Sequence, residues 1–106
     1  MSVRLTWPQY LRGECTIDGV RVYLRPFEME VFSTLLLRRG CLVTTSELVD
    51  VCWPDPDEMP EDPGGAVKVH VCKLRQQVGA LVETLHGRGY TIAKPLPNIA
   101  TERLAA

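Results

Sequence analysis

The apolar residues in the first quarter of the chain alternate with polar ones. In the stretch CTIDGVRVYL, residues 15–24, the alternation lies on both sides of Asp18-Gly19. Alternation with a period of two is typical of half-buried strands, and Asp-Gly is a strong signal for a two-residue hairpin turn. We therefore predict short strands over residues 2–24, with a β-hairpin centred on Asp18-Gly19.

From Pro26 the spacing of the apolar residues becomes helical. Proline is favoured in the first turn of a helix, and Gly40 directly after Arg38 and Arg39 is a common way for a helix to end. These features predict a helix over about residues 26–39. Its apolar positions are Met29, Val31, Phe32, Leu35 and Leu36.

Two further helices are predicted after this one. Residues 41–43 are a candidate strand, and Thr44 then precedes Glu47 by three residues, which is the spacing of a capping box. A second helix is expected from there to about Trp53. A third is predicted over residues 66–78, because one apolar stripe recurs there with helical spacing. That stripe consists of Val67, Val71, Leu74 and Val78.

The last predicted element is a second hairpin over residues 81–93, with His86-Gly87-Arg88-Gly89 at its tip. Glycine accepts positive φ without a Cβ penalty, so the two glycines favour a tight turn. The arginine between them is either a solvated tip residue or a cation presented to something negatively charged. Residues 95–106 are expected to form a tail. The whole order predicts an α+β fold with one domain over residues 1–94.

The composition narrows the class of protein. The 106 residues are 45% hydrophobic and 24% charged, which is typical of one soluble globular domain. No apolar run approaches the roughly 20 residues of a membrane span, and the N-terminus has no signal-peptide pattern. A cytoplasmic location without membrane contact is therefore expected.

Charge is unevenly distributed along the chain. The net charge is −1, but residues 54–65 hold five acids and no base, so the remainder carries +4. The same segment contains four prolines, which disfavour a helix and predict an exposed loop. The chain is thus a mildly basic domain with an acidic insertion. The acids, which are candidates for contacting a protein partner, are Asp55, Asp57, Glu58, Glu61 and Asp62.

Sequence motifs for catalysis or cofactor binding do not occur in this chain. Its four cysteines lie far apart without a Cys-x-x-Cys pair, which argues against a disulfide framework and against a zinc site. We therefore expect no metal, no cofactor and no small-molecule ligand, and we do not expect an enzyme.

The outward side of the predicted third helix is the main candidate site. Val69, Lys73 and Gln76 lie at i, i+4 and i+7 on one outward stripe, which His70 and Gln77 flank. A cation, an amide and an apolar group on one helix face suit a DNA major groove, where they can meet guanine or phosphate, adenine and a thymine methyl. The alternative is an ordinary solvated helix face.

Four segments, taken in order, resemble the OmpR/PhoB-type effector domain of bacterial two-component response regulators. The segments are LRPFEMEVF, GCLVTTSELVDVCW, VKVHVCKLRQQV and TLHGRGYTI. They are similar to the family patterns L-T-x-x-E-F-x-L-L, G-x-V-V-S-R-E-x-L-x-x-x-V-W, V-D-V-H-I-x-R-L-R-x-K-L and T-V-R-G-x-G-Y. The resemblance covers about residues 16–93 in unbroken order.

The resemblance implies a winged helix-turn-helix with an N-terminal antiparallel sheet, three helices and a C-terminal hairpin wing. Helix 66–78 would enter the major groove, and the wing, residues 81–93, would lie at the adjacent minor groove. Val69 and Lys73 would touch bases, while Trp53 would either reach a phosphate or serve as a core aromatic. The full set of expected DNA-binding residues is Trp53, Lys68, Val69, His70, Lys73, Arg75, Gln76, Gln77, Thr84, His86 and Arg88.

Several positions depart from the family pattern. Arg25 stands where a threonine is usual, which removes a good helix N-cap. His86 stands where arginine is frequent, so Arg88 is expected to supply the cation of the wing tip. With His70 and His86 on the presumed DNA side, binding should tighten as the pH falls from about 8 to about 6, because histidine gains charge near neutrality. Tyr90 is expected in the core.

Two functions remain open on this reading. The first is a sequence-specific, double-stranded DNA-binding transcription regulator from a bacterium or phage, able to form a tandem dimer on DNA. The alternative is a protein-interaction module of the same fold that binds RNA polymerase or a response regulator. In the resembled family the loop matching residues 54–65 faces away from DNA and can touch RNA polymerase; otherwise it is a solvated spacer. No receiver domain precedes the module, so a stand-alone effector domain is expected.

Overall fold

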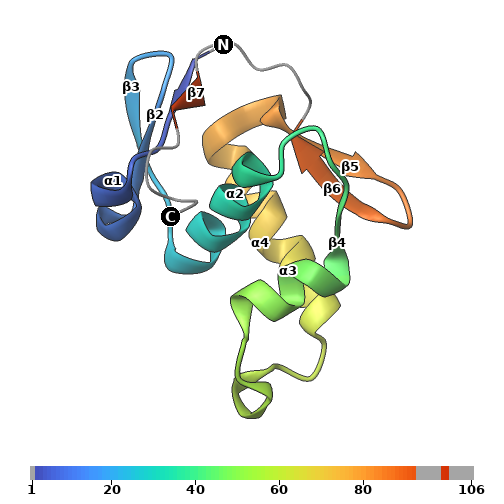
Figure 1. The fold of residues 1–106 in the computed structure, drawn as a ribbon. Coiled ribbons are helices and arrows are strands. Elements are labelled where there is room, and N and C mark those ends of the chain that lie inside the picture. The colour runs from blue at the N-terminus through green and yellow to red at the C-terminus, as the bar shows by residue number, and fades with distance from the viewer. Residues whose placement is uncertain (1, 93–98, 101–106) are drawn as a thin grey trace.

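The computed structural model describes residues 2–92 and 99–100 (Figure 1). Helices lie between two small β-sheets, one at the N-terminal side of the molecule and one that includes the C-terminal hairpin. The first sheet has the strand order β3-β2-β1-β7, and the second has the order β4-β6-β5. This α+β architecture confirms the predicted winged helix-turn-helix.

The N-terminal sheet contains the hairpin predicted at Asp18-Gly19. Strands β2 (Glu14–Ile17) and β3 (Val20–Tyr23) pair antiparallel. Both turn residues have positive φ, 51° and 81°, as a two-residue hairpin of this kind requires. Strand β1 (Val3–Arg4) pairs antiparallel with β2 and parallel with β7 (Ile99–Ala100).

The prediction that residues 2–24 form only short strands is wrong, because helix α1 (Trp7–Arg12) lies between β1 and β2. Thr6 precedes the helix, and its backbone N–H donates to Gln9 Oε1 at 3.0 Å. Gly13 ends the helix with a φ of 74°, a left-handed conformation that glycine adopts without penalty. The Thr-x-x-Gln spacing is itself a capping signal, which the alternation of apolar residues around it concealed.

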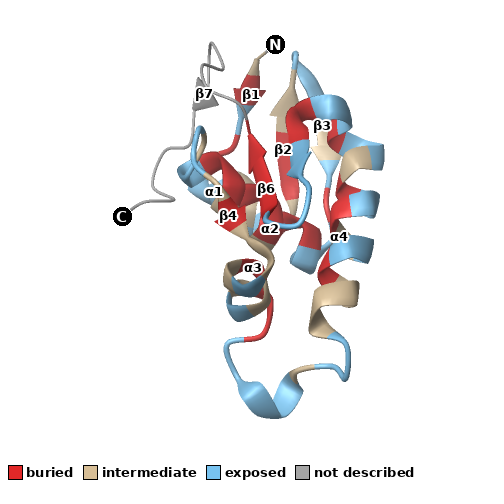
Figure 2. Cartoon of the chain, turned by 90° about the vertical axis from the view of Figure 1, so that its right-hand side faces the viewer, coloured by how far each residue is buried: buried red, intermediate tan, exposed pale blue. Residues whose placement is uncertain are grey.

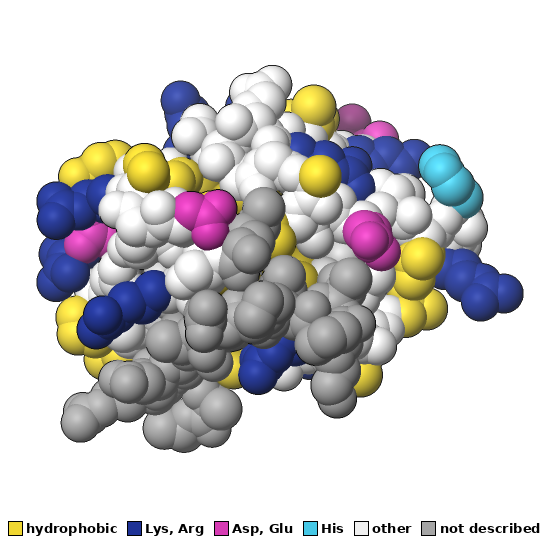
Figure 3. All heavy atoms as spheres, turned by 90° about the horizontal axis from the view of Figure 1, so that it is seen from above, with side chains coloured by type: hydrophobic (Ala, Val, Ile, Leu, Met, Phe, Trp, Pro, Cys, Tyr) yellow, Lys and Arg dark blue, Asp and Glu magenta, His cyan; other side chains and the backbone are white. Residues whose placement is uncertain are grey.

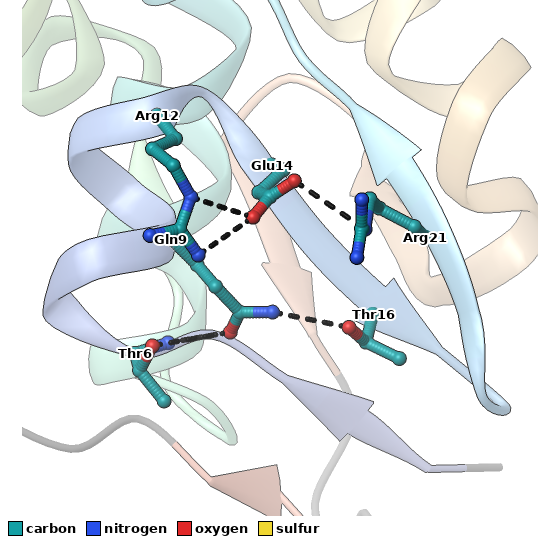
Figure 4. Close-up of polar contacts among 6 residues, drawn as sticks. All are labelled: Thr6, Gln9, Arg12, Glu14, Thr16 and Arg21. Atoms are coloured by element: carbon teal, nitrogen blue, oxygen red, sulfur yellow. Dashed lines mark hydrogen bonds and ion pairs between the residues drawn. The ribbon is translucent and has the colours of Figure 1, made fainter.

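A polar network attaches α1 to the hairpin (Figure 4). Gln9 Nε2 donates to Thr16 Oγ1 at 3.1 Å. Glu14, only 6% exposed, accepts from Arg12 Nε at 2.8 Å and lies 3.5 Å from Arg21 Nε. A carboxylate this far from solvent needs such partners, because desolvation otherwise disfavours its charged form.

The next two helices form as predicted, with slightly shifted ends. Helix α2 (Pro26–Leu37) begins at the predicted proline and ends two residues before the predicted 39. Helix α3 (Thr45–Cys52) has the predicted capping box. Glu47 N–H donates to Thr44 Oγ1 at 3.1 Å, and Thr44 N–H donates to Glu47 Oε2 at 2.9 Å. The pKa of Glu47 is lowered, chiefly because its carboxylate accepts this backbone hydrogen bond.

Helix α4 (Pro63–Val78) begins three residues before the predicted helix 66–78. Asp62 Oδ1 accepts from Gly65 N–H at 3.0 Å, so Asp62 caps this helix. Proline at position 63 is tolerated because the first helical turn does not use its missing N–H. The predicted loop through Gly65 is therefore too long, and it also contains a 3₁₀ turn, η1 (Pro56–Glu58). We call residues 54–62 the acidic loop from here on.

The wing is the hairpin formed by β5 (Val82–Leu85) and β6 (Gly89–Ile92). Leu81, predicted within the hairpin, belongs instead to the 3₁₀ turn η2 (Gly79–Leu81). Strand β4 is Val43–Thr44 rather than 41–43, and it pairs antiparallel with β6. Ala93 and, apart from β7, the predicted tail lie outside the described residues.

The core lies between the second, third and fourth helices and the two sheets. Figure 2 shows α4 buried along the side towards the other helices and exposed along the opposite side. Tyr90 is only 6% exposed, as expected for a core aromatic. The predicted apolar stripe of α4 is fully or almost fully buried: Val67, Val71, Leu74 and Val78. The rest of α4 is thereby left to face outward.

Candidate nucleic-acid interface

The exposed side of α4 carries most of the residues predicted to bind DNA. Val69, Lys73 and Gln76 form the middle of this side, because residues at i, i+4 and i+7 share a helix face. Val69 is 49% exposed, which is high for a valine on a helix whose other face is core. Lys68 and Gln77 are exposed on either side of the stripe. The structure agrees with the outward stripe predicted from the sequence.

One flank of α4 faces the wing across a groove of about 320 Å³. Lys68 lines the groove from the helix, and Thr84, His86 and Arg88 line it from the wing. A concave surface lined by cations raises the local concentration of anions such as phosphate. Thr45, at the start of α3, also lines the groove; no site role was predicted for it, since its local pattern indicates only a helix start.

Arg75, which was predicted to bind DNA, makes several contacts within the domain. Its Nε donates to the Val82 carbonyl at 3.1 Å, and its guanidinium also donates to Thr84 Oγ1. The same guanidinium carbon lies 5.8 Å from the centre of the Tyr90 ring, within the range of a cation–π contact. Arg75 therefore connects α4 to the wing, and the Thr84 hydroxyl accepts one of the hydrogen bonds of that connection.

The other flank of α4 carries an aromatic cluster of Phe27, Trp53 and His70. The ring of His70 lies 4.9 Å from that of Phe27 and 6.0 Å from that of Trp53. Trp53 is 8% exposed, so of its two predicted roles the structure favours the core aromatic. Burial lowers the pKa of His70, the nearby Lys73 lowers it further, and Glu28 opposes them. His70 is therefore held among rings rather than projecting freely toward a partner.

The wing tip explains why two glycines flank an arginine. Gly87 has a φ of 74° inside the turn, with open space where a Cβ would be. A Cβ on Gly89 would lie 2.1 Å from the Val43 carbonyl oxygen. The first glycine thus permits the turn, and the second permits β6 to approach β4. Gly89 therefore serves the packing of the chain against itself rather than the turn.

The tip presents its side chains to solvent. His86 and Arg88 are both exposed. Figure 3 shows a His side chain together with Lys and Arg side chains at the end of the molecule that carries the wing, and further Lys and Arg side chains at the opposite end. The acidic loop lies at the far end of α4, and Figure 2 shows it exposed along almost its whole length.

Two acids of that loop cap helical turns. Asp62 caps α4, and its predicted contact with a protein partner stays a prediction. Asp55 Oδ1 accepts from the Asp57 N–H at 3.0 Å and so caps the 3₁₀ turn. Asp57, Glu58 and Glu61 are exposed and belong to no ion pair within the described part of the chain.

Within residues 2–92 and 99–100, no group of three His, Cys, Asp or Glu side chains could hold a metal ion. Over that same part of the chain, none of the helices is both long enough and apolar enough to span a membrane.

Comparison with known proteins identifies the family. Residues 19–92 match the family described as "Transcriptional regulatory protein, C terminal". The chain is 32% identical over 83 residues to the transcriptional regulatory protein CutR of Streptomyces coelicolor, and 32% identical over 85 residues to the cell cycle response regulator CtrA of Brucella ovis. These alignments cover 76% and 74% of this chain but 37% and 35% of the two relatives. The chain thus spans little more than a third of their length.

Solved structures share the fold. The C-terminal domain of the nisin resistance regulator NsrR matches with a TM-score of 0.65 and 23% identity, over 79% of this chain and 88% of that one. The DNA-binding domain of the response regulator AdeR, solved in complex with an intercistronic region, matches with a TM-score of 0.64 and 22% identity, over 78% and 87% of the two chains. With the family match over most of its length, this chain belongs to the OmpR/PhoB-type family of C-terminal, DNA-binding domains of transcriptional regulatory proteins.

Proposed function

We propose that this domain binds double-stranded DNA at specific sequences, with α4 in the major groove and the wing at the adjacent minor groove, and regulates transcription in this way. Domains of this family are DNA-binding regulators of transcription and are not enzymes. The observation that carries the proposal is the groove between Lys68 and the wing, directly beside the outward stripe of α4.

The dimensions of DNA support this placement. A helix with its side chains is about 10–12 Å across, and the major groove of B-DNA is about 12 Å wide. With the outward stripe toward the base edges, Lys73 would meet guanine, Gln76 adenine and Val69 a thymine methyl. Lys68 and Arg88 would then face phosphates, which set the position of the protein without reading sequence.

Selection of bound genomic fragments, followed by gel shifts at two salt concentrations, tests the proposal. Specific binding through several phosphates should enrich a common sequence and weaken steeply as salt rises. A protein that enriches no sequence and shifts no duplex at either salt concentration is not a DNA-binding regulator of this kind.

The orientation of α4 is tested by Lys73→Ala. If Lys73 reads a base, the change should cost roughly 1–3 kcal/mol of specific binding and relax the preference at one position of the site. Arg4→Ala, which removes an exposed cation from β1 in the N-terminal sheet, is the control and should leave the preference intact. Binding of the Lys73 variant like that of the parent contradicts the placement of the helix.

We also propose that the acidic loop contacts a protein, with RNA polymerase as the candidate because its basic surfaces suit an acidic segment. The supporting observation is that the exposed acids belong to the loop before α4, and that none of them lines the groove proposed for DNA. Acids outside that groove would repel DNA less than acids lining it would.

Neutralising the loop separates this second role from DNA binding. Changing Asp57, Glu58 and Glu61 to Asn or Gln should leave DNA affinity equal or higher, and should reduce binding to purified RNA polymerase and transcription in vitro. Asp62→Asn is the matched control, since asparagine caps a helix about as well as aspartate. Unchanged polymerase binding and transcription with the triple variant would reduce the loop to a spacer.

A further inference from the structure

A second basic surface lies on the flank of α4 opposite the wing. There a pocket of about 230 Å³ is lined by Arg25, Pro26, Phe27, Glu28, His70 and Lys73. Arg25 directly precedes α2, whereas Lys73 belongs to the outward stripe of α4. The pocket therefore places an arginine from a distant part of the sequence beside the surface proposed to read bases.

The charges around this pocket leave its two cations available. The Glu28 carboxylate, 5% exposed, accepts from the Arg25 backbone N–H at 2.8 Å. Glu28 thereby caps α2 even though arginine cannot accept the reciprocal bond. Within residues 2–92, the ion pairs are Arg12 and Arg21 with Glu14, and Arg38 with Glu47. Neither Arg25 nor Lys73 takes part in one, and both are exposed.

The pocket is also held in place by packing. The Phe27 ring lies 4.9 Å from the His70 ring and 5.4 Å from the Trp53 ring. These contacts tie the start of α2 to α4 and to the end of α3. Arg25 is thus attached to a well-packed part of the domain. Its own backbone N–H already donates to the Glu28 carboxylate.

In a major groove, the flank of α4 beside Arg25 would face one of the two phosphate strands. Because the helix nearly fills the groove, a phosphate strand lies on each side of it. Lys68, which lines the wing groove, and His70, which lines this pocket, are two residues apart and so point about 200° apart around the axis. The wing flank therefore faces one strand, and the Arg25 flank faces the other.

We propose that Arg25 binds a backbone phosphate on the strand opposite the one contacted by the wing, so that the two flanks hold α4 between the strands. This inference rests on the DNA binding proposed above and adds a site to it. Arginine suits the task because its guanidinium is always charged and matches phosphate with paired donors. The family pattern has threonine at this position, so the contact is a property of this chain.

The salt dependence of binding tests the contact. Arg25→Gln keeps a polar side chain and the backbone N–H but removes the charge, and Arg4→Gln makes the same charge change on β1. With the duplex that the parent selects, the slope of log affinity against log salt should fall by about 0.9 for Arg25→Gln and hardly change for Arg4→Gln. The ratio of the DNA affinity of the parent to that of Arg25→Gln should then fall about 3.5-fold when the salt concentration rises from 50 to 200 mM.

Duplexes with single neutral methylphosphonates locate the contact. One phosphate should be found whose neutralisation weakens DNA binding by the parent but not by Arg25→Gln, and a second phosphate should be found in the same way with Arg88→Gln. The two phosphates should lie on opposite strands, across the major groove from each other. Equal slopes for Arg25→Gln and Arg4→Gln, or two phosphates on the same strand, would overturn the inference while leaving specific DNA binding in place. If the parent selects no sequence, the proposed function fails first and the Arg25 contact fails with it.

Discussion

Residues 2–92 contain two β-hairpins whose strands are each four residues long, and they differ in what their polar side chains contact. In the N-terminal hairpin the buried Glu14 pairs with Arg12 and Arg21. At its turn, Asp18 Oδ1 accepts from the Ser2 N–H at 2.7 Å. The charges of this hairpin are therefore satisfied by the domain itself, and its turn is tied to the first strand.

In the wing, the internal polar contacts lie at the base rather than at the tip. Arg75 donates to the Val82 carbonyl and to Thr84, whereas the side chains of His86 and Arg88 make no hydrogen bond or ion pair within residues 2–92. A hairpin fixed at its base with exposed cations at its tip is suited to contacting a partner. The two hairpins are thus distinguished by the pairing of their charges, because the strand pattern of both is similar.

The largest expected difference between the hairpins is the loss of stability when one glycine in each is changed to alanine. Gly89→Ala should lower the free energy of unfolding by about 3 kcal/mol or more, because the new Cβ would overlap the Val43 carbonyl. Gly19→Ala, at a φ of 81° with open space around it, should cost about 1–2 kcal/mol. Urea unfolding of both variants makes the comparison. Equal losses would mean that β4 and β6 are not packed this closely.

A smaller effect is expected at the base of the wing. Arg75→Ala removes two hydrogen bonds and a cation–π contact, and should cost about 1–2 kcal/mol of stability. Arg21→Ala in the first hairpin removes a 3.5 Å ion pair from an exposed arginine and should cost much less, because Glu14 keeps Arg12 as its partner. Hydrogen exchange of the β5 amides should quicken only for Arg75→Ala. Unchanged exchange there would show that Arg75 does not hold the wing.

The cations of the two hairpins should differ in DNA binding by a comparable or smaller amount. Arg88→Gln should weaken binding by about 1 kcal/mol and lower the salt slope by about 0.9, because it removes one phosphate contact. Arg21→Gln removes the same charge from a hairpin whose arginine already has a carboxylate partner, and it should change neither value appreciably. Titrations of the selected duplex at several salt concentrations provide the measurement. Equal effects of the two variants would contradict the assignment of the wing to DNA.

The smallest effect concerns pH, and here the structure revises the expectation from the sequence. The folded-state pKa of His70 is lowered from 6.5, first by burial and then by Lys73. The unfolded chain therefore takes up a proton more readily, so His70 makes the fold less stable as the pH falls below about 6.5 and has no such effect above it. His70 should accordingly add little to any gain in DNA affinity between about pH 8 and about 6.

Replacement of the imidazole checks this sign. His70→Phe keeps a ring against Phe27 and Trp53, and should flatten the fall in unfolding free energy as the pH drops below about 6.5. His86→Phe, at the exposed wing tip, serves as the control. An unchanged pH profile in the His70 variant would place the titrating group elsewhere.

Much of the domain could be predicted from the sequence, because several of its elements carry local signals. The stripe of α4, the capping box of Thr44 and Glu47, and the Asp18-Gly19 turn all depend on residues within a few positions of one another. Helix α1 has a local signal too, in Thr6 and Gln9, but a six-residue helix is not stable by itself in water. Its formation depends on tertiary contacts such as those of Arg12 and Gln9 with strand β2.

The sequence by itself determined which side of α4 faces outward, since burial of one apolar stripe leaves the opposite side to solvent. Only the tertiary structure decided what lies on the two flanks of that side. Helical periodicity places Arg75 and His70 beside the outward stripe of α4, but it does not predict which distant element packs against each of them. Arg75 donates a hydrogen bond to the wing, and the His70 ring packs against Phe27 at the start of α2. The same packing places Arg25 and Lys73 in one pocket. Such contacts depend on how elements far apart in the chain pack together, and no local pattern records that.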